Sequence, residues 1–154
     1  MNKKNTLLLF LCLFCLWAVA QEKKPVKIAC VGNSITYGSG IKNQFQNSYP
    51  GLLSQLLGEG YDVRNFGISA RVMLNKGDHP YMHEQKFRDL LAFQPDIVTI
   101  KLGTNDSKPW NWHYGKDFGK DLTEMLDILQ DLPSKPKIYL CFPVPAVKRN
   151  FGIN

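Results

Sequence analysis

Three short turns carry residues that could together perform acyl transfer. They read Gly32-Asn33-Ser34, Gly67-Ile68-Ser69 and Gly103-Thr104-Asn105-Asp106. Acyl transfer needs a nucleophilic hydroxyl and hydrogen-bond donors aimed at the developing oxyanion. Ser34 could supply the hydroxyl, and the backbone amides of Ser34 and Gly67 with the Asn105 side chain could supply the donors. The alternative is that all three are ordinary turns, but their repetition after successive strands favours a shared site.

The elements around these turns are predicted from the spacing of apolar residues. Short apolar runs indicate strands, and stretches with helical spacing indicate amphipathic helices between them. The strands are expected over 26–31, 61–66, 96–102 and 138–142, and the helices over 48–57, 82–93 and 116–132. Alternation of strand and helix predicts an α/β fold with a parallel sheet. Ligands of such sheets bind beyond the carboxyl ends of the strands, where the three turns lie.

The turns also resemble the sequence blocks of a known family. Residues 31–38, 65–69 and 102–106 are similar, in order and spacing, to the first three blocks of the SGNH/GDSL hydrolase superfamily. The resemblance implies a flavodoxin-like three-layer α/β/α sandwich and ester hydrolysis without a cofactor. It implies that Ser34 is the nucleophile and that Gly67 and Asn105 are oxyanion donors. Asn33 replaces the commoner Asp, as in members similar to carbohydrate-active esterases.

The chain departs from the family at the catalytic base. The family carries an Asp-x-x-His block near its C-terminus, and none of the three histidines here follows an Asp at that spacing. His79 and His83 are separated by Pro80, and no further ligands suggest a metal. His113 could approach the site from the third turn. We expect a truncated domain that lacks its last strand, its last helix and its base, and that is inactive as it stands.

The segment after the third turn contains candidate substrate-binding residues. It includes Trp110, Asn111 and Trp112 between Lys108 and Tyr114. Flat aromatic faces suit the C–H faces of sugars, and Asn111 could bond to hydroxyl groups. The alternative is that both indoles pack this loop onto the next helix.

The first twenty residues have the features of a signal peptide. Lys3 and Lys4 precede an uncharged stretch over 7–20 that ends in Ala18-Val19-Ala20. Cleavage is expected between Ala20 and Gln21, which leaves an exported hydrolase domain over 21–154, periplasmic or secreted, without a stable membrane anchor. The formal charge is +6, but the Lys and Arg residues are scattered, which argues against nucleic acid as a partner.

These observations predict an exported serine esterase that removes O-acyl groups, specifically acetyl, from a carbohydrate. Its partner would be a small-molecule or glycan ester, with no metal and no cofactor. One alternative is a lipid esterase or lysophospholipase of the same superfamily. Another is a non-catalytic glycan-binding module that kept the pocket and lost the base.

Two cysteines remain after the expected cleavage, Cys30 and Cys141. They fall in the first and fourth predicted strands, and a flavodoxin-like order places the third strand between them. Strands lie about 4.8 Å apart, whereas a disulfide needs Cα atoms within about 7 Å. We therefore expect both thiols to be unpaired core residues.

Overall fold

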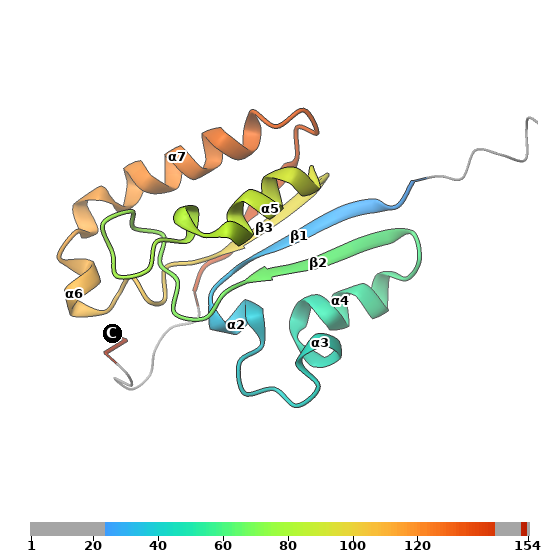
Figure 1. The fold of residues 1–154 in the computed structure, drawn as a ribbon, viewed down its shortest axis with the longest axis horizontal. Helices are drawn as coiled ribbons and strands as arrows, with labels where there is room; N and C mark the ends of the chain where they lie inside the picture. The colour runs from blue at the N-terminus through green and yellow to red at the C-terminus, as the bar shows by residue number, and fades with distance from the viewer. Residues whose placement is uncertain (1–23, 144–151, 154) are drawn as a thin grey trace, which may run out of the picture.

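A parallel four-stranded sheet forms the centre of the chain, which a computed structural model describes over residues 24–143 and 152–153 (Figure 1). The strands are β1 (Val26–Gly32), β2 (Tyr61–Gly67), β3 (Ile97–Lys101) and β4 (Lys137–Leu140). Their order across the sheet is β2-β1-β3-β4, and all three pairings are parallel. The predicted α/β class and strand order are confirmed.

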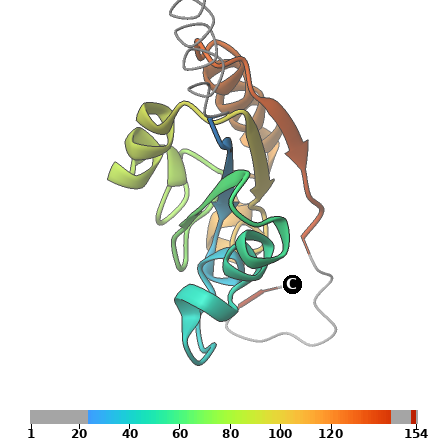
Figure 2. The ribbon, with the colours of Figure 1, turned by 90° about the vertical axis from the view of Figure 1, so that its right-hand side faces the viewer.

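Helices cover both faces of the sheet. One face carries α5 (Gln85–Phe93) and α7 (Phe118–Gln130), and the other carries α3 (Gln44–Asn47) and α4 (Tyr49–Leu57) (Figures 1 and 2). Two further α-helices of four residues, α2 (Ser34–Tyr37) and α6 (Pro109–Trp112), follow the carboxyl ends of β1 and β3. Short 3₁₀ turns, η1 (Tyr81–His83) and η2 (Gly115–Asp117), precede α5 and α7. The result is a three-layer α/β/α arrangement.

The main core lies between the sheet and the pair α5 and α7. Apolar residues on the facing sides of these elements are buried together; they include Val31, Val98, Ile100, Phe87, Leu90, Met125 and Leu129. The buried residues of α5 and α7 have the helical spacing from which these two helices were predicted. This burial stabilises the sheet whose strand ends carry the three turns, because apolar area removed from water contributes about 25 cal/mol per Å².

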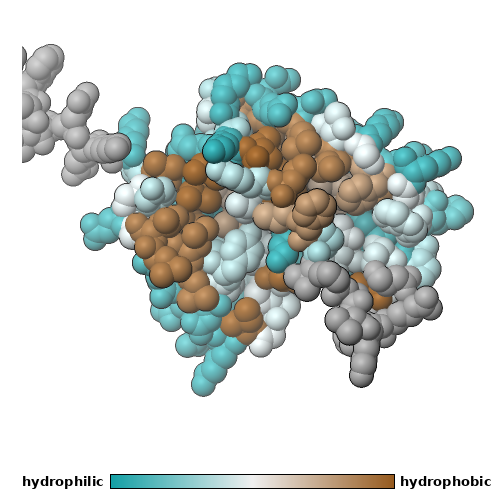
Figure 3. All heavy atoms as spheres, turned by 180° about the vertical axis from the view of Figure 1, so that it is seen from behind, coloured by the Kyte–Doolittle hydropathy of each residue, from teal (hydrophilic) through white to brown (hydrophobic). Residues whose placement is uncertain are grey.

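The opposite layer is thinner. Helix α4 is anchored to the sheet by a hydrogen bond between the Tyr49 hydroxyl and Thr99 Oγ1 (3.1 Å), and burial raises the pKa of Tyr49. Its outer apolar side chains stay in contact with solvent, with Leu56 83% exposed. Hydrophobic side chains accordingly gather in broad surface patches in the view from behind (Figure 3).

The predicted helix over 82–93 is shorter than expected. The structure has the 3₁₀ turn η1 first, then an extended residue, Glu84, and only then α5. The buried Tyr81 hydroxyl donates to the Phe66 carbonyl oxygen (2.6 Å), and Glu84 pairs with Arg71 (2.8 Å). Both contacts join residues distant in sequence, so local spacing does not reveal them.

The fourth strand also differs from its prediction. It spans Lys137–Leu140 rather than 138–142, and three of its four residues are exposed. Cys30 is buried as expected, but Cys141 is exposed, so its assignment to the core is wrong. The reason is that β4 pairs only with β3 within the described residues. Both cysteines are free thiols, as predicted.

The predicted signal peptide over 1–20 lies outside the described residues. Over the described ranges, the chain forms no helix with the length and apolar character needed to cross a membrane.

Candidate active site

The three candidate turns begin side by side. Gly32, the last residue of β1, pairs with Gly67 at the end of β2 and with Lys101 at the end of β3. The Ile68 amide donates to the Gly32 carbonyl oxygen (3.0 Å), which joins the second turn to the first. In Figure 1 this edge of the sheet lies at the left of the view, between α2 and α6. The sequence prediction of one shared edge is confirmed.

Ser34 begins helix α2 at the end of β1. The helix starts there because the Asn33 side-chain oxygen accepts a hydrogen bond from the Ile35 amide (3.0 Å), and Gly38 ends it with a φ of 89°. Ser34 is half-buried. Among the described side chains, none forms a hydrogen bond with its hydroxyl, so none of them is placed as its base.

Gly67 lies directly against the helix that carries Ser34. A Cβ at residue 67 would come 2.3 Å from the Tyr37 nitrogen, so only glycine allows this approach. The Gly67 amide donates to Asn65 Oδ1 (2.9 Å). In this arrangement the amide already has an acceptor, and a role as oxyanion donor requires that bond to open or to be shared. That role remains a prediction.

Asn105 is held in the third turn by its neighbours. It is buried, and its side-chain Nδ2 donates to the Arg71 carbonyl oxygen (3.0 Å). A primary amide has two N–H donors, so one donor remains for a ligand. The bond to Arg71 also joins the third turn to the segment that follows the second turn. The first two turns are therefore joined by a direct hydrogen bond, and the third turn is bonded to the segment that follows the second.

Asp106 is a site-supporting residue that the sequence interpretation missed. It is fully buried, and its Oδ1 accepts from the Met73 and Leu74 amides (2.8 and 2.9 Å). Burial raises the pKa of Asp106, and these backbone donors oppose the rise in part. No local pattern indicated its burial, because Asp106 lies between the polar residues Asn105 and Ser107 and its partners are more than thirty residues away in the sequence.

Asn111 supports the loop from within. It is 1% exposed, and its Nδ2 donates to the Asn105 carbonyl oxygen (2.9 Å) and to Asp78 Oδ1 (3.1 Å). Its Oδ1 accepts from the Asp78 amide (2.8 Å). The expected contact with sugar hydroxyls is therefore wrong for this arrangement, because the side chain is buried and its amide is engaged inside the protein.

The two indoles of α6 remain at the surface. Trp110 and Trp112 are each 55% exposed. Trp110 Nε1 donates to Asp78 Oδ2 (3.1 Å), while Trp112 lies against Phe118 with ring centroids 6.1 Å apart. Trp112 thus packs one side on the next helix, as the alternative interpretation proposed. Their binding to a substrate remains a prediction.

None of the three histidines is hydrogen-bonded to Ser34 in the described part of the chain. His79, His83 and His113 are exposed, and His113 contacts only the neighbouring Tyr114 ring at 5.0 Å among the ring contacts found. No cluster of three metal-ligating side chains occurs over 24–143 and 152–153.

The chain is a parallel α/β sandwich, and a serine and an asparagine lie at the carboxyl edge of its sheet. This arrangement is typical of α/β hydrolases. The family is identified by sequence. The model of the GDSL-like lipase/acylhydrolase family matches residues 30–153, and the chain belongs to that family. The resemblance inferred from the three turns is confirmed.

Individual esterases are similar to this chain in sequence or in fold. The chain is 49% identical over 152 aligned residues to an acetylxylan esterase of Xylanibacter ruminicola, and the match covers 88% of this chain. The fold is similar to that of the inhibitor-bound M. smegmatis aryl esterase (23% identity, TM-score 0.64, 78% of this chain and 65% of that one). It is also similar to AlinE4, an SGNH-hydrolase family esterase (23% identity, TM-score 0.56, 78% and 60%).

The chain is shorter than these relatives. It spans 32% of the length of the acetylxylan esterase. The family match over residues 30–153 contains the turns of Ser34, Gly67 and Asn105.

Proposed function

We propose that this chain is the nucleophile-bearing part of an exported serine esterase that removes acetyl groups from a carbohydrate. The observation that carries the proposal is the position of Ser34, which begins a helix at the carboxyl edge of the sheet beside the Asn105 turn. The 49% identity to an acetylxylan esterase supports acetylated xylan as the substrate. The predicted signal peptide supports export to where such polymers are found.

In the proposed reaction, Ser34 Oγ attacks the acetyl carbonyl carbon. The carbonyl oxygen becomes an oxyanion, stabilised by the free N–H of Asn105 and by backbone amides of the first two turns. The sugar oxygen leaves with a proton, and an acetyl-serine remains. Water then attacks that ester, releases acetate and restores the Ser34 hydroxyl.

The base for both proton transfers is expected outside the given sequence. No Asp-x-x-His occurs in it, and no described side chain bonds to the Ser34 hydroxyl. Removal of a triad member leaves only about 10³–10⁴-fold acceleration over water in the serine-hydrolase template. We therefore expect the 154-residue chain to turn over p-nitrophenyl acetate negligibly, whereas a longer product that supplies an Asp-x-x-His block should do so at an ordinary enzymatic rate.

The test measures acetate release by that longer product from acetylated xylan. Ser34→Ala should abolish release, while Ser69→Ala, which removes a nearby hydroxyl bonded to Ser39 Oγ (2.7 Å), should retain most of it. Lysophospholipid hydrolysis measured in parallel addresses the lipid alternative. Acetate release unaffected by Ser34→Ala, or a preference for the lipid, would contradict the proposal.

A further inference from the structure

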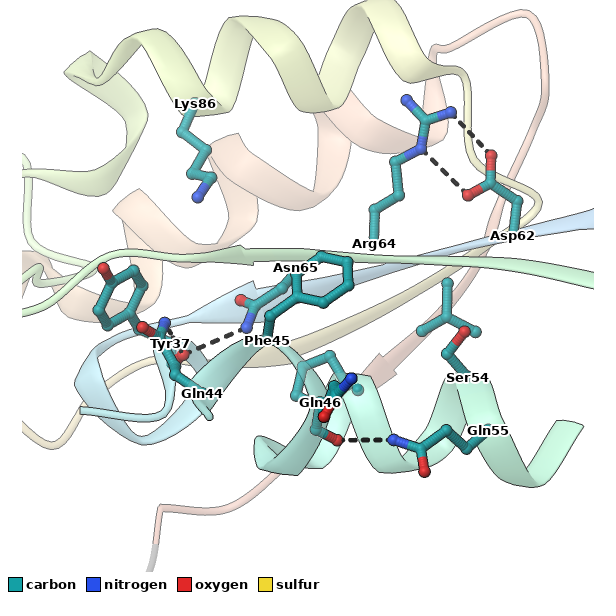
Figure 4. Close-up of a pocket in the computed structure, with 13 residues that line it drawn as sticks. Tyr37, Gln44, Phe45, Gln46, Ser54, Gln55, Asp62, Arg64, Asn65 and Lys86 are labelled. Carbon is teal, nitrogen blue, oxygen red and sulfur yellow. Dashed lines mark hydrogen bonds and ion pairs between the residues drawn. The ribbon is translucent and has the colours of Figure 1, made fainter. Parts of the chain in front are cut away.

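A hollow of about 820 Å³ lies along the outer edge of β2, away from the turn of Asn105. Lys86 of α5 lies on one side of β2, and residues of α3 and α4 lie on the other (Figure 4). Small-molecule sites typically have volumes of about 300–1,000 Å³. The hollow is therefore large enough to bind a ligand, and the chemistry of its walls indicates which kind.

Its walls are rich in neutral polar groups and exposed aromatic rings. Amides and hydroxyls come from Gln44, Gln46, Gln55, Asn65, Ser54 and Tyr37. The Phe45 side chain is 93% exposed, and Tyr37 is 39% exposed. An aromatic ring that packs on nothing is available to a partner, and its flat face complements the apolar C–H face of a sugar ring. The Gln44 and Gln55 side chains each use one amide N–H on a backbone carbonyl oxygen. Their second N–H and their side-chain oxygens complement the hydroxyl groups at the sugar's rim.

The charges of the hollow also favour a neutral ligand. Arg64 forms two hydrogen bonds with the Asp62 carboxylate (3.1 and 2.8 Å), so these two charges compensate one another. Lys86 Nζ lies 3.5 Å from the Gly67 carbonyl oxygen and is the remaining cation in the lining. A phosphate or polyanion site would be expected to gather several unpaired cations.

The hollow adjoins the nucleophile through two shared elements. Tyr37 is the last residue of α2, whose first residue is Ser34, and a helix rises about 1.5 Å per residue. Asn65 lies two residues before Gly67, and its Nδ2 donates to the Thr36 carbonyl oxygen (3.0 Å). A polymer with one sugar at Ser34 would need only a short distance to reach this hollow.

We propose that this hollow, hereafter the β2-edge hollow, is a second subsite that binds neighbouring unmodified sugars of the glycan, with Phe45 as its aromatic platform. The proposal rests on the function proposed above. It explains an exposed aromatic ring beside a polar hollow at the edge of the sheet, because the ring would be covered when the polymer is bound.

Binding is tested first without chemistry. The 154-residue chain is run in native gels containing soluble deacetylated xylan, and its retardation gives an affinity. Phe45→Ala should weaken that affinity about tenfold, the ratio that corresponds to about 1.4 kcal/mol. Leu56→Ala is the matched control, because it removes another highly exposed apolar side chain, on α4, outside the hollow. It should leave retardation unchanged.

The longer gene product provides the second measurement. Phe45→Ala should raise KM for acetylated xylan about tenfold and leave p-nitrophenyl acetate kinetics unchanged, because the small ester does not reach the hollow. Equal retardation of Phe45→Ala and the parent chain, or equal losses in Phe45→Ala and Leu56→Ala, would overturn the β2-edge subsite. Absence of acetate release with intact xylan retardation would instead overturn the esterase proposal alone.

Discussion

Asn105 uses one amide N–H to hold its own loop and has a second one left for chemistry. In the longer enzyme, Asn105→Ala should lower kcat by about 10²–10³, the usual loss for one oxyanion donor. It should also destabilise the fold by about 0.5–1.5 kcal/mol, because the bond to the Arg71 carbonyl oxygen is lost. Steady-state kinetics and thermal melting measure the two effects separately.

Asn111→Ala is the control for that experiment. It removes the hydrogen bond to the Asn105 carbonyl oxygen and two bonds to Asp78, so it should destabilise the protein at least as much. Its loss of kcat should be smaller, because its amide faces no substrate. An Asn105→Ala enzyme with unchanged kcat would remove Asn105 from the active site.

The Asp106 side chain should stabilise the fold as a hydrogen-bond acceptor for two backbone amides. The burial of its negative charge should reduce that stabilisation. Asp106→Ala leaves the buried Met73 and Leu74 amides without their acceptor and should cost about 2–6 kcal/mol, at about 1–3 kcal/mol per unsatisfied group. Asp106→Asn keeps a side-chain oxygen for these donors and should cost much less. Urea unfolding of the two variants at neutral pH provides the comparison, and equal losses would contradict it.

The pH dependence of the same residue follows from its raised pKa. The folded state holds the Asp106 proton at pH values where the unfolded chain has released it, so this group's contribution to stability falls as pH rises from the ordinary Asp range through the raised pKa. Relative to Asp106→Asn, the parent protein should therefore gain stability as pH is lowered through that window. Urea midpoints of both proteins across the acidic range measure the difference, and a difference independent of pH would contradict the raised pKa.

At the scale of elements, the contact between β2 and α2 sets the position of Ser34. Gly67→Ala would place a methyl group 2.3 Å from the Tyr37 nitrogen and 2.8 Å from the Thr36 carbonyl carbon. The backbone would have to move, at a cost of about 1–3 kcal/mol, and Ser34 would move with its helix. Melting temperature and kcat of the longer enzyme should both fall.

The matched control is Gly60→Ala. A Cβ at residue 60 meets no atom within 4 Å, and its φ is not in the left-handed region. Such a substitution should be neutral or slightly stabilising. Equal effects of the two alanines would show that α2 does not lie against the end of β2.

Sequence patterns predicted the elements whose burial is periodic. Helix α7 and strands β1 to β3 follow from apolar spacing, and the shared edge of Ser34 and Asn105 follows from the parallel order. The patterns did not predict the supports of the site, because Asp106 and Met73, or Asn111 and Asp78, are 33 residues apart in sequence. The break at Glu84 has the same origin, an ion pair with Arg71.

At the scale of the whole molecule, the two edges of the sheet differ in character. The β2 edge adjoins a hollow with polar walls, whereas the β4 edge presents Tyr139, Leu140 and Phe142, which are 46%, 51% and 95% exposed. A second, mainly apolar hollow of about 220 Å³ lies under the β4 edge and includes Leu102, Phe118 and Cys141 in its lining. An exposed apolar sheet edge is prone to pairing with another strand. We therefore expect that a segment which packs on this chain would cover the β4 edge before any other surface.

The two thiols differ in their exposure to solvent. Cys30 is fully buried between β2 and β3, and burial raises its pKa, whereas Cys141 is exposed just beyond β4. A thiol reagent such as DTNB should therefore modify Cys141 rapidly in the native chain lacking residues 1–20, and Cys30 only when the sheet opens. The rate at Cys30 then measures global unfolding.

Cys141→Ser provides the control, because it should remove the rapid phase and leave the slow one unchanged. Adding urea should accelerate the slow phase only, since the native surface already exposes Cys141. Two rapid thiols would contradict the burial of Cys30 in a formed sheet. No rapid thiol would show that the β4 edge is covered in solution, and dilution that restores the rapid phase would identify the cover as a second copy of the chain. A longer product in which added residues pack on β4 should lose the rapid phase at every concentration.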